Sequence, residues 1–295
     1  MFICISTRSY IPNTIDTHFF VFVSFQRVVP SRIIDTPAST FLGSPPLSIE
    51  KREKALGDTH LTYHPSTCRK CSRCSFEVFG YLLYTLYGAL FATTSLFAID
   101  LFYGVYGERN VVLFVVTLPV VQLTMGAALC LLIVVSKWTI MCGRFKAGTY
   151  PLFSFYVWRT ELVERLEENL AEPILLNMLD GTCWKVFYYR CMGAKIGRRP
   201  YLGHSIVTEP DMISIGNDAT IESGGTLQAH LFQDRMRLVK EVRLGHSVSV
   251  GSNSVVLLGG KLHDNVNLNP LSLNMRDEEL PPRTEWTGSP ATRTW

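Results

Sequence analysis

One segment of the sequence, LQAHLFQDRMRLVKEVR at residues 227–243, contains a histidine placed where acid–base chemistry is plausible. Histidine side chains in general can exchange protons near neutral pH, so the imidazole of His230 could take a proton from an attacking amine or hydroxyl and return one to a leaving thiolate. A single histidine more often serves as a structural hydrogen-bonding group. His230, however, stands at the entrance of an irregular loop, and loops positioned by a rigid scaffold commonly carry function. We therefore interpret His230 as the candidate general base.

Charged residues in this segment and in a second irregular stretch are candidates for substrate binding. Asp234 and Arg235 follow His230 closely, whereas Glu209 and Asp211 lie upstream. A carboxylate from the upstream pair could orient the histidine or bind an amine.

Both irregular stretches interrupt a repeat of six residues. A branched aliphatic residue returns at every sixth position from Leu244 to Leu268, and the same phase occurs upstream. The positions are Ile196, Leu202, Ile215, Ile221, Leu227, Leu244, Val250, Val256, Leu262 and Leu268. Neither the 3.6-residue period of a helix nor the 2-residue period of a strand explains this spacing. A period of six is typical of hexapeptide-repeat β-helices, so we expect a left-handed parallel β-helix with the aliphatic side chains inside.

The repeat loses its phase at two points. Leu227 and Leu244 are 17 residues apart, and Leu202 and Ile215 are 13 apart, and neither number is a multiple of six. The chain must therefore leave the β-helix near His230, and it is also irregular near Glu209.

Two long stretches without charged residues precede the repeat. Residues 78–99 form a run of 22 residues, and residues 111–136 form a run of 26. Each can cross a hydrocarbon core of about 30 Å as a helix, and Pro119 in the second run is tolerated in a membrane helix. A buried hairpin in a soluble core is the alternative. Two such runs joined by one short polar loop favour a membrane hairpin with lipid as its partner.

The flanking charges predict the orientation of this hairpin. Basic residues lie outside both runs, at Arg69, Lys70, Arg73, Lys137, Arg144 and Lys146, and the short loop holds only Arg109. The positive-inside rule then places the N- and C-termini and the β-helix in the cytosol. The net charge of +3 is too small to indicate a nucleic-acid partner.

The eight cysteines do not form an evident disulfide framework. Cys68, Cys71 and Cys74 lie in the sequence CRKCSRC just before the first apolar run. Their spacing is compatible with a zinc site, which needs four ordered ligands, with reversible palmitoylation beside the membrane, or with unreactive thiols.

These features divide the chain into four predicted parts. Residues 1–75 are a poorly ordered leader, 76–136 the transmembrane hairpin, 137–192 an amphipathic helical connector or cap, and 193–291 the β-helix. In the connector, Leu162, Leu166 and Leu170 recur at a spacing of four, which is typical of an amphipathic helix.

The end of the connector, residues 174–192, admits two interpretations. This aromatic segment either lies in the membrane interface, with Trp184, Tyr188 and Tyr189 at headgroup level, or packs as a cap over the open end of the β-helix.

Several segments resemble known proteins. The hexads, followed by WTGSPA at residues 286–291, resemble the hexapeptide-repeat acyltransferases. YPLFSFYVWRTELVERL, GTCWKVFYYRCMGAKIG, TLQAHLFQDR and NPLSLNM more closely resemble the membrane-bound C-terminal modules of poly-lysine synthetase-type nonribosomal peptide synthetases, over about residues 76–291.

This resemblance implies an amide-forming acyltransferase. It implies that His230 is the base, and that the donor is an acyl thioester of coenzyme A or of the phosphopantetheine of a carrier protein. It also implies an amine acceptor, an adenylation or carrier-protein partner, a homotrimer or tandem-module assembly, and no metal. Candidate contacts for the donor are Gly259, Gly260, Asn269 and Gly288.

The chain departs from the full synthetase architecture. We find no adenylate-forming signature, no carrier serine motif and only a single module. A stand-alone enzyme and a fragment of a larger synthetase both remain open. So do a coenzyme A-dependent O- or N-acetyltransferase of a small molecule and a non-catalytic membrane-tethered module.

Overall fold

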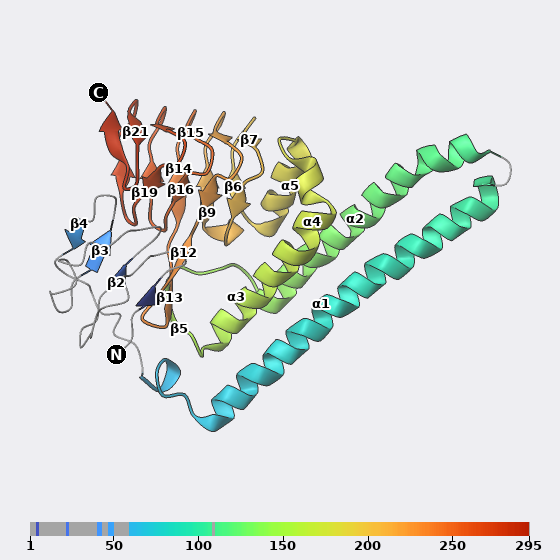
Figure 1. The fold of residues 1–295 in the computed structure, drawn as a ribbon, viewed down its shortest axis with the longest axis horizontal. Helices are drawn as coiled ribbons and strands as arrows, with labels where there is room; N and C mark the ends of the chain where they lie inside the picture. The colour runs from blue at the N-terminus through green and yellow to red at the C-terminus, as the bar shows by residue number, and fades with distance from the viewer. Residues whose placement is uncertain are drawn as a thin grey trace, which may run out of the picture.

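The computed structural model describes residues 59–107 and 110–294, and also four short strands nearer the N-terminus. These strands, β1 (Cys4–Ile5), β2 (Phe22–Val23), β3 (Thr40–Leu42) and β4 (Leu47–Ile49), form one sheet (Figure 1). Most of the predicted leader, residues 1–75, lies outside the described residues.

Two long helices form an antiparallel pair that runs beside the following helices and projects beyond them at one end (Figure 1). Helix α1 (Thr67–Phe102) begins before the predicted residue 76, because the Ser66 side chain accepts a hydrogen bond from the N–H of Arg69 and caps it. A π-helical turn, η3 (Tyr103–Gly107), continues α1, and α2 (Val111–Met141) returns.

Both helices are long and apolar enough to cross a membrane. Only 6% and 33% of their most apolar stretches are buried, which is unlike the core helix of a soluble protein. These helices are therefore candidate membrane spans.

The connector packs its apolar face against this hairpin. It comprises β5 (Gly148–Pro151), α3 (Phe155–Leu166), the π-helical η4 (Glu167–Ala171), α4 (Glu172–Ile174), η5 (Leu176–Leu179) and α5 (Cys183–Met192). Leu162, Leu166 and Leu170 are all buried. A Cβ atom at Gly80 would lie 3.0 Å from Leu162 Cδ1, so the absence of a side chain there lets α1 and α3 approach closely.

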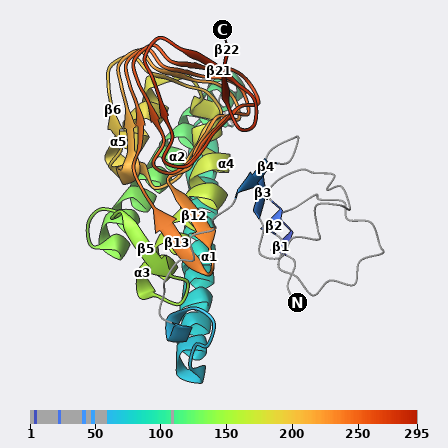
Figure 2. The same cartoon turned by 90° about the vertical axis from the view of Figure 1, so that its left-hand side faces the viewer.

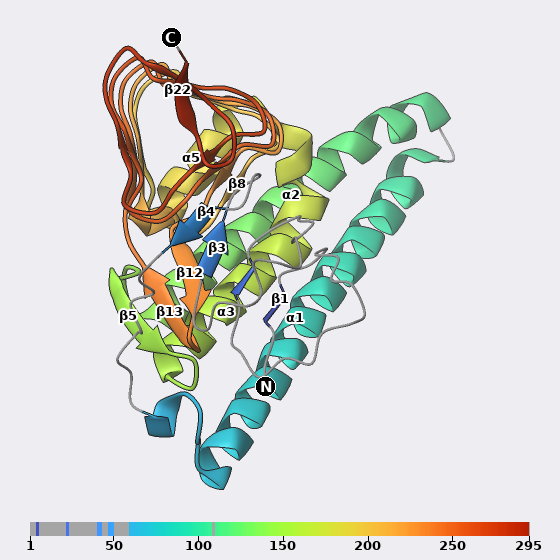
Figure 3. The same cartoon turned by 60° about the vertical axis from the view of Figure 1, so that its left-hand side comes forward.

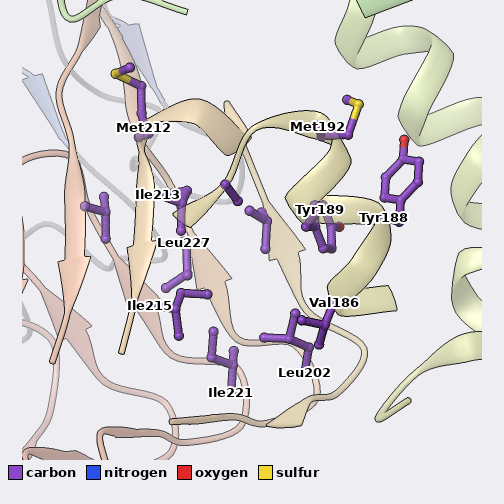
Figure 4. Close-up of a cluster of buried hydrophobic side chains, with 14 of the residues drawn as sticks. Val186, Tyr188, Tyr189, Met192, Leu202, Met212, Ile213, Ile215, Ile221 and Leu227 are labelled. Atoms are coloured by element: carbon purple, nitrogen blue, oxygen red, sulfur yellow. The ribbon is translucent and has the colours of Figure 1, made fainter. Parts of the chain in front are cut away.

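Helix α5 covers the first coil of the β-helix, as a solenoid requires at its end. Val186, Tyr189 and Met192 pack beside Leu202 and other aliphatic residues of the first coils (Figure 4). The aromatic residues differ in exposure. Tyr188 and Tyr189 are buried in the core and not at a headgroup level, whereas Trp184 is 64% exposed. The cap interpretation therefore fits α5 better than an interfacial helix.

Residues 195–287 form a parallel β-helix built from three sheets, whose coils appear as stacked triangles in Figure 3. The strands are β6 (Lys195–Ile196), β7 (Tyr201–Leu202), β8 (Ile206–Val207), β9 (Ile213–Ile215), β10 (Thr220–Ile221), β11 (Thr226–Leu227), β14 (Val242–Leu244), β15 (Ser249–Val250), β16 (Val255–Val256), β17 (Lys261–Leu262), β18 (Asn267–Leu268), β19 (Leu273–Asn274), β20 (Glu279–Leu280) and β21 (Glu285–Thr287). Strand β22 (Thr292–Thr294) closes the end antiparallel to β21.

The hexad positions stack on one another inside the β-helix, which confirms the predicted repeat. Ile221 aligns with Val250, and Val250 with Leu268, and all three side chains are completely buried. Successive coils in this regular part are 18 residues apart, which equals three hexads. One stack departs from the aliphatic pattern. Asn274 in β19 lies beside Val256 of the preceding coil, and its side chain is also fully buried.

The two interruptions of the repeat have different structures. The first is the single-turn helix η6 (Pro210–Met212). The second is a β-hairpin of β12 (His230–Gln233) and β13 (Met236–Val239), and β13 also pairs with β5 (Figure 2). Positive φ angles at Asp234 and Arg235 make the tight turn between the two strands.

Candidate functional site

The two interruptions bring His230 and Glu209 together. Nδ1 of His230, at the start of β12, lies 2.7 Å from Oε1 of Glu209, just before η6. The His230 side chain is 15% exposed, whereas that of Glu209 is completely buried. The imidazole therefore lies between a buried carboxylate and the protein surface.

The backbone at Glu209 has an unusual conformation. Its φ of 40° lies in the left-handed region, which non-glycine residues seldom adopt. The residue also precedes Pro210, which restricts its conformation further. Such backbone angles persist only where the surrounding structure enforces them, and they are concentrated at functional sites.

A buried arginine from the second strand of the hairpin completes the cluster. Arg237, in β13, is fully buried and pairs with Oε1 of Glu209 and with both carboxylate oxygens of Glu164, in α3. Its Nη2 also lies 3.3 Å from Nδ1 of His230. Arg237 thus joins the connector helix, the first interruption and the hairpin.

The pKa values of the Glu209 and Glu164 carboxyls are shifted in opposite directions. Burial raises the pKa of Glu209, but its hydrogen bond to His230 and the charges of His230 and Arg237 outweigh burial and lower this pKa to about 2. Burial and the charge of Glu209 raise the pKa of Glu164 to about 7, against the opposing effect of Arg237. Burial lowers the pKa of Arg237, but its two carboxylates outweigh burial and raise it overall.

This arrangement defines the protonation of the imidazole. Glu209 is ionised at neutral pH and can only accept hydrogen bonds, so its partner Nδ1 carries the proton in neutral His230. Nδ1 then cannot also accept from Arg237, whose Nη2 is farther away than the Glu209 oxygen. The other nitrogen, Nε2, is left with a free lone pair and can act as a base.

Three residues of this cluster could offer ligands to a metal ion. The ligand atoms of Glu164, Glu209 and His230 all lie within 4.8 Å of one another. However, the guanidinium of Arg237 already contacts both carboxylates and would repel a second cation at the same place. We therefore interpret Arg237 as the positive charge that balances the two carboxylates of this cluster.

The other predicted substrate-binding residues do not join the cluster. Asp211 is buried and faces α2, where its Oδ2 lies 2.6 Å from Nζ of Lys137. Asp234 and Arg235 form the hairpin turn, and Arg235 donates to the carbonyl oxygen of Thr62. Arg235 therefore links the β12–β13 turn to the segment before α1.

The predicted donor contacts lie in later coils. Gly259 has a φ of +77°, and Gly260 packs so closely on Asn274 that a Cβ would overlap its side chain. Asn269 bonds to Glu285 and Thr287 of the next coil. Gly288 has a φ of +106° in the closing turn. Each of these residues has a role within the coils themselves.

The thiols that suggested a zinc site do not converge on a metal cluster. Cys68, Cys71 and Cys74 are exposed on α1. Among the residues that the structure describes, the one potential metal cluster is that of Glu164, Glu209 and His230, without any cysteine.

Sequence reasoning missed Glu164 and Arg237. Arg237 lies in the same irregular segment as His230, but the Asp234-Arg235 turn lacks the Asn-Gly or Asp-Gly signal that marks a two-residue hairpin. Glu164 lies on the polar face of the leucine-spaced helix, where the sequence offers no signal that separates it from Glu161 or Glu168.

Taken together, the structure is a parallel β-helix with a histidine–carboxylate pair at a hairpin excursion, joined to two candidate membrane spans. The sequence is 32% identical over 272 residues to Delta-poly-L-ornithine synthetase of Acinetobacter baumannii. This match covers 92% of the chain and only 20% of the relative. The predicted resemblance to synthetases of poly-amino acids is thus confirmed for a segment of such an enzyme. No protein-family model matches the chain.

Solved structures of hexapeptide-repeat acetyltransferases also match, with low scores. A maltose O-acetyltransferase of Clostridium difficile is 13% identical with a TM-score of 0.37, covering 54% of this chain and 95% of that protein. A hexapeptide-repeat acetyltransferase of Vibrio cholerae is 16% identical with a TM-score of 0.33, covering 41% and 85% respectively.

Proposed function

We propose that this protein is a membrane-anchored acyltransferase that forms an amide bond between an amine and a pantetheine-linked acyl thioester. The observation that carries the proposal is the contact between Nδ1 of His230 and Glu209, which leaves Nε2 of this partly exposed side chain available as a base. The relative is named for making a polymer of ornithine. Amino-acid polymers are joined by amide bonds, which supports an amine as the acceptor.

In the proposed reaction, the amine nitrogen attacks the carbonyl carbon of the thioester while Nε2 of His230 takes a proton from that nitrogen. The ionised Glu209 stabilises the imidazolium that forms, because it lies against Nδ1. The carbon–sulfur bond then breaks, and His230 returns the proton to the thiolate. The products are an amide and a free thiol, and no covalent enzyme intermediate is needed.

We further propose the components that the reaction requires. The donor is coenzyme A or the phosphopantetheine of a carrier protein, bound along the later coils near Gly259, Gly260, Asn269 and Gly288. A carrier donor requires an adenylation or carrier-protein partner. The β-helix is left-handed, and it assembles as a trimer or beside a tandem module. The helices α1 and α2 hold the β-helix on the cytosolic face of a membrane.

A mass-spectrometric assay tests this function. Purified protein in detergent is incubated with acetyl- and aminoacyl-pantetheine thioesters and a panel of amines, including ornithine and lysine. We expect amide product from the wild type and a loss of at least about a hundredfold in His230→Ala. His64→Ala, at an exposed position before α1, is the matched control and should retain activity. Equal product from wild type and His230→Ala would exclude His230 as the base.

A further inference from the structure

A fully buried ion pair connects the candidate membrane helix α2 to the first coil of the β-helix. Nζ of Lys137 lies 2.6 Å from Oδ2 of Asp211, and neither side chain is exposed. The ammonium also lies 3.6 Å from the centre of the Trp138 ring. The backbone N–H of Phe145 donates to the same Oδ2 at 2.8 Å. Two groups, both from α2 or the segment that follows it, therefore hold this one carboxylate oxygen.

Stability alone is a weak explanation for this pair. Removing two charges from water carries a large desolvation penalty, and apolar residues of similar volume often replace buried ion pairs at no cost in stability. The pair does, however, fix the position of Asp211 relative to α2, because each buried charge requires its partner close by. The role of the pair therefore depends on the segment that contains Asp211.

Asp211 lies two residues after Glu209, in the same irregular turn. The N–H of Met212 donates to the carbonyl oxygen of Glu209 at 2.8 Å, so Glu209 and helix η6 form one hydrogen-bonded unit. Glu209 keeps a left-handed backbone conformation there, which requires support from its surroundings. The carboxylate of Asp211, fixed against α2, supplies such support.

We propose that Lys137 is a positioning residue for the active site. Through Asp211 it holds the turn that carries Glu209, so that the Glu209 carboxylate reaches Nδ1 of His230. Helix α2 is then part of the scaffold of the site as well as an anchor. This inference rests on the proposed function of His230 and Glu209, and Lys137 itself does not touch the reacting atoms.

A second buried lysine supplies a matched control. Lys185, in α5, pairs with Asp180 and donates to the carbonyl oxygen of Gly203 at 2.9 Å. This pair also ties the helical connector to the first coil. Helix α5 packs near η6, but the bonds of Lys185 go to Asp180 and Gly203 and not to the turn that carries Glu209. Changes to Lys185 therefore report the cost of losing a buried lysine that is not bonded to that turn.

The test compares two double variants that each remove both charges of a pair, Lys137→Met/Asp211→Asn and Lys185→Met/Asp180→Asn. We expect the first to lower kcat on the order of 10- to 100-fold, as a small misplacement of a catalytic group does, with KM little changed. The second should keep the wild-type kcat. Modification of His230 by diethyl pyrocarbonate, followed by mass spectrometry, should be several-fold faster in the first variant alone.

The kinetic and the modification measurements together distinguish the positioning role of Lys137 from the proposed acyltransferase activity. Wild-type kcat and a wild-type modification rate in Lys137→Met/Asp211→Asn would overturn the positioning role. No product from wild type, with faster modification of His230 in that variant, would remove the proposed function and keep the positioning contact. If the double variant does not fold, Asp211→Glu is compared with Asp180→Glu. The first should lose kcat and the second should not, and equal rates would again overturn the role.

Discussion

Nδ1 of His230 lies 2.7 Å from Oε1 of Glu209, and each residue comes from one of the two interruptions of the six-residue repeat. In the regular coils the inward positions are filled by aliphatic residues except at Asn274, whereas this histidine–carboxylate pair forms where the chain leaves the repeat. The departures from the repeat therefore create the site, and the regular coils hold it in place. Arg237 and Glu164 extend this contact to the connector helix.

The first prediction concerns Glu209→Gln, which keeps the size of the side chain and removes its charge. The amide no longer stabilises an imidazolium, so we expect kcat to fall on the order of a hundredfold or more. Initial rates in the amide-forming assay measure this effect. Glu77→Gln, on α1, changes an exposed carboxylate paired with Arg73 and should remain active. Wild-type rates in Glu209→Gln would show that the pair is not catalytic.

The second prediction concerns the buried guanidinium. Arg237→Met leaves Glu209 and Glu164 without their shared cation, and breaking a buried pair in this way costs about 3–5 kcal/mol of unfolding free energy. Thermal unfolding in detergent should show a large decrease in Tm. The exposed pair of Arg243 and Glu241 provides the control, since Arg243→Met should change stability by no more than about 1 kcal/mol. Similar decreases in both variants would contradict the central place of Arg237.

The third prediction concerns pH. The pKa of Glu164 is raised to about 7 in the folded protein, whereas an unfolded glutamate titrates near 4.3. Between these values only the folded protein holds the proton, so the stabilising contribution of Glu164 is complete below about pH 4.3 and is lost as pH rises through 7. Glu209 behaves in the opposite way, and its contribution is lost only as pH falls from about 4.3 towards 2.

Glu164→Gln isolates this effect. The Tm of the wild type minus that of Glu164→Gln should decrease as pH rises from about 4.5 to 7.5. Scanning fluorimetry of both proteins across this range gives the difference directly. Parallel curves would mean that Glu164 has the same pKa in the folded and the unfolded protein.

The repeat could be read directly from the sequence, because each hexad sets the inward position by local spacing alone. Its two phase losses also located His230 and Glu209. The sequence could not predict the contacts of Glu164 with Arg237 or of Lys137 with Asp211. Both residues lie on helices whose position depends on packing between distant segments. The close contact at Gly80 is one such determinant. The turn of Asp234 and Arg235 lacks the usual Asn-Gly signal, so the sequence predicts an irregular loop where the structure has a hairpin.

The fourth prediction concerns metal ions. Because Arg237 occupies the space between Glu164 and Glu209, incubation with EDTA should leave both Tm and amide formation unchanged. Added zinc should not raise Tm. Loss of activity with the chelator, followed by recovery with zinc, would show that a metal ion displaces Arg237 in the working enzyme.

The fifth prediction tests how the hairpin crosses the membrane. Cys74 lies near the start of α1 and Cys142 directly after α2, and both are exposed, whereas Cys130 is buried within α2. The flanking basic residues predict that this end of the helix pair faces the cytosol. In variants that retain a single cysteine, a membrane-impermeant maleimide should label Cys74 and Cys142 in inside-out vesicles and not in sealed cells. Cys130 should stay unlabelled in both until detergent and denaturant are added. Labelling of Cys74 in sealed cells would reverse the orientation, and the site at His230 would then lie away from the cytosolic thioesters that the proposed reaction consumes.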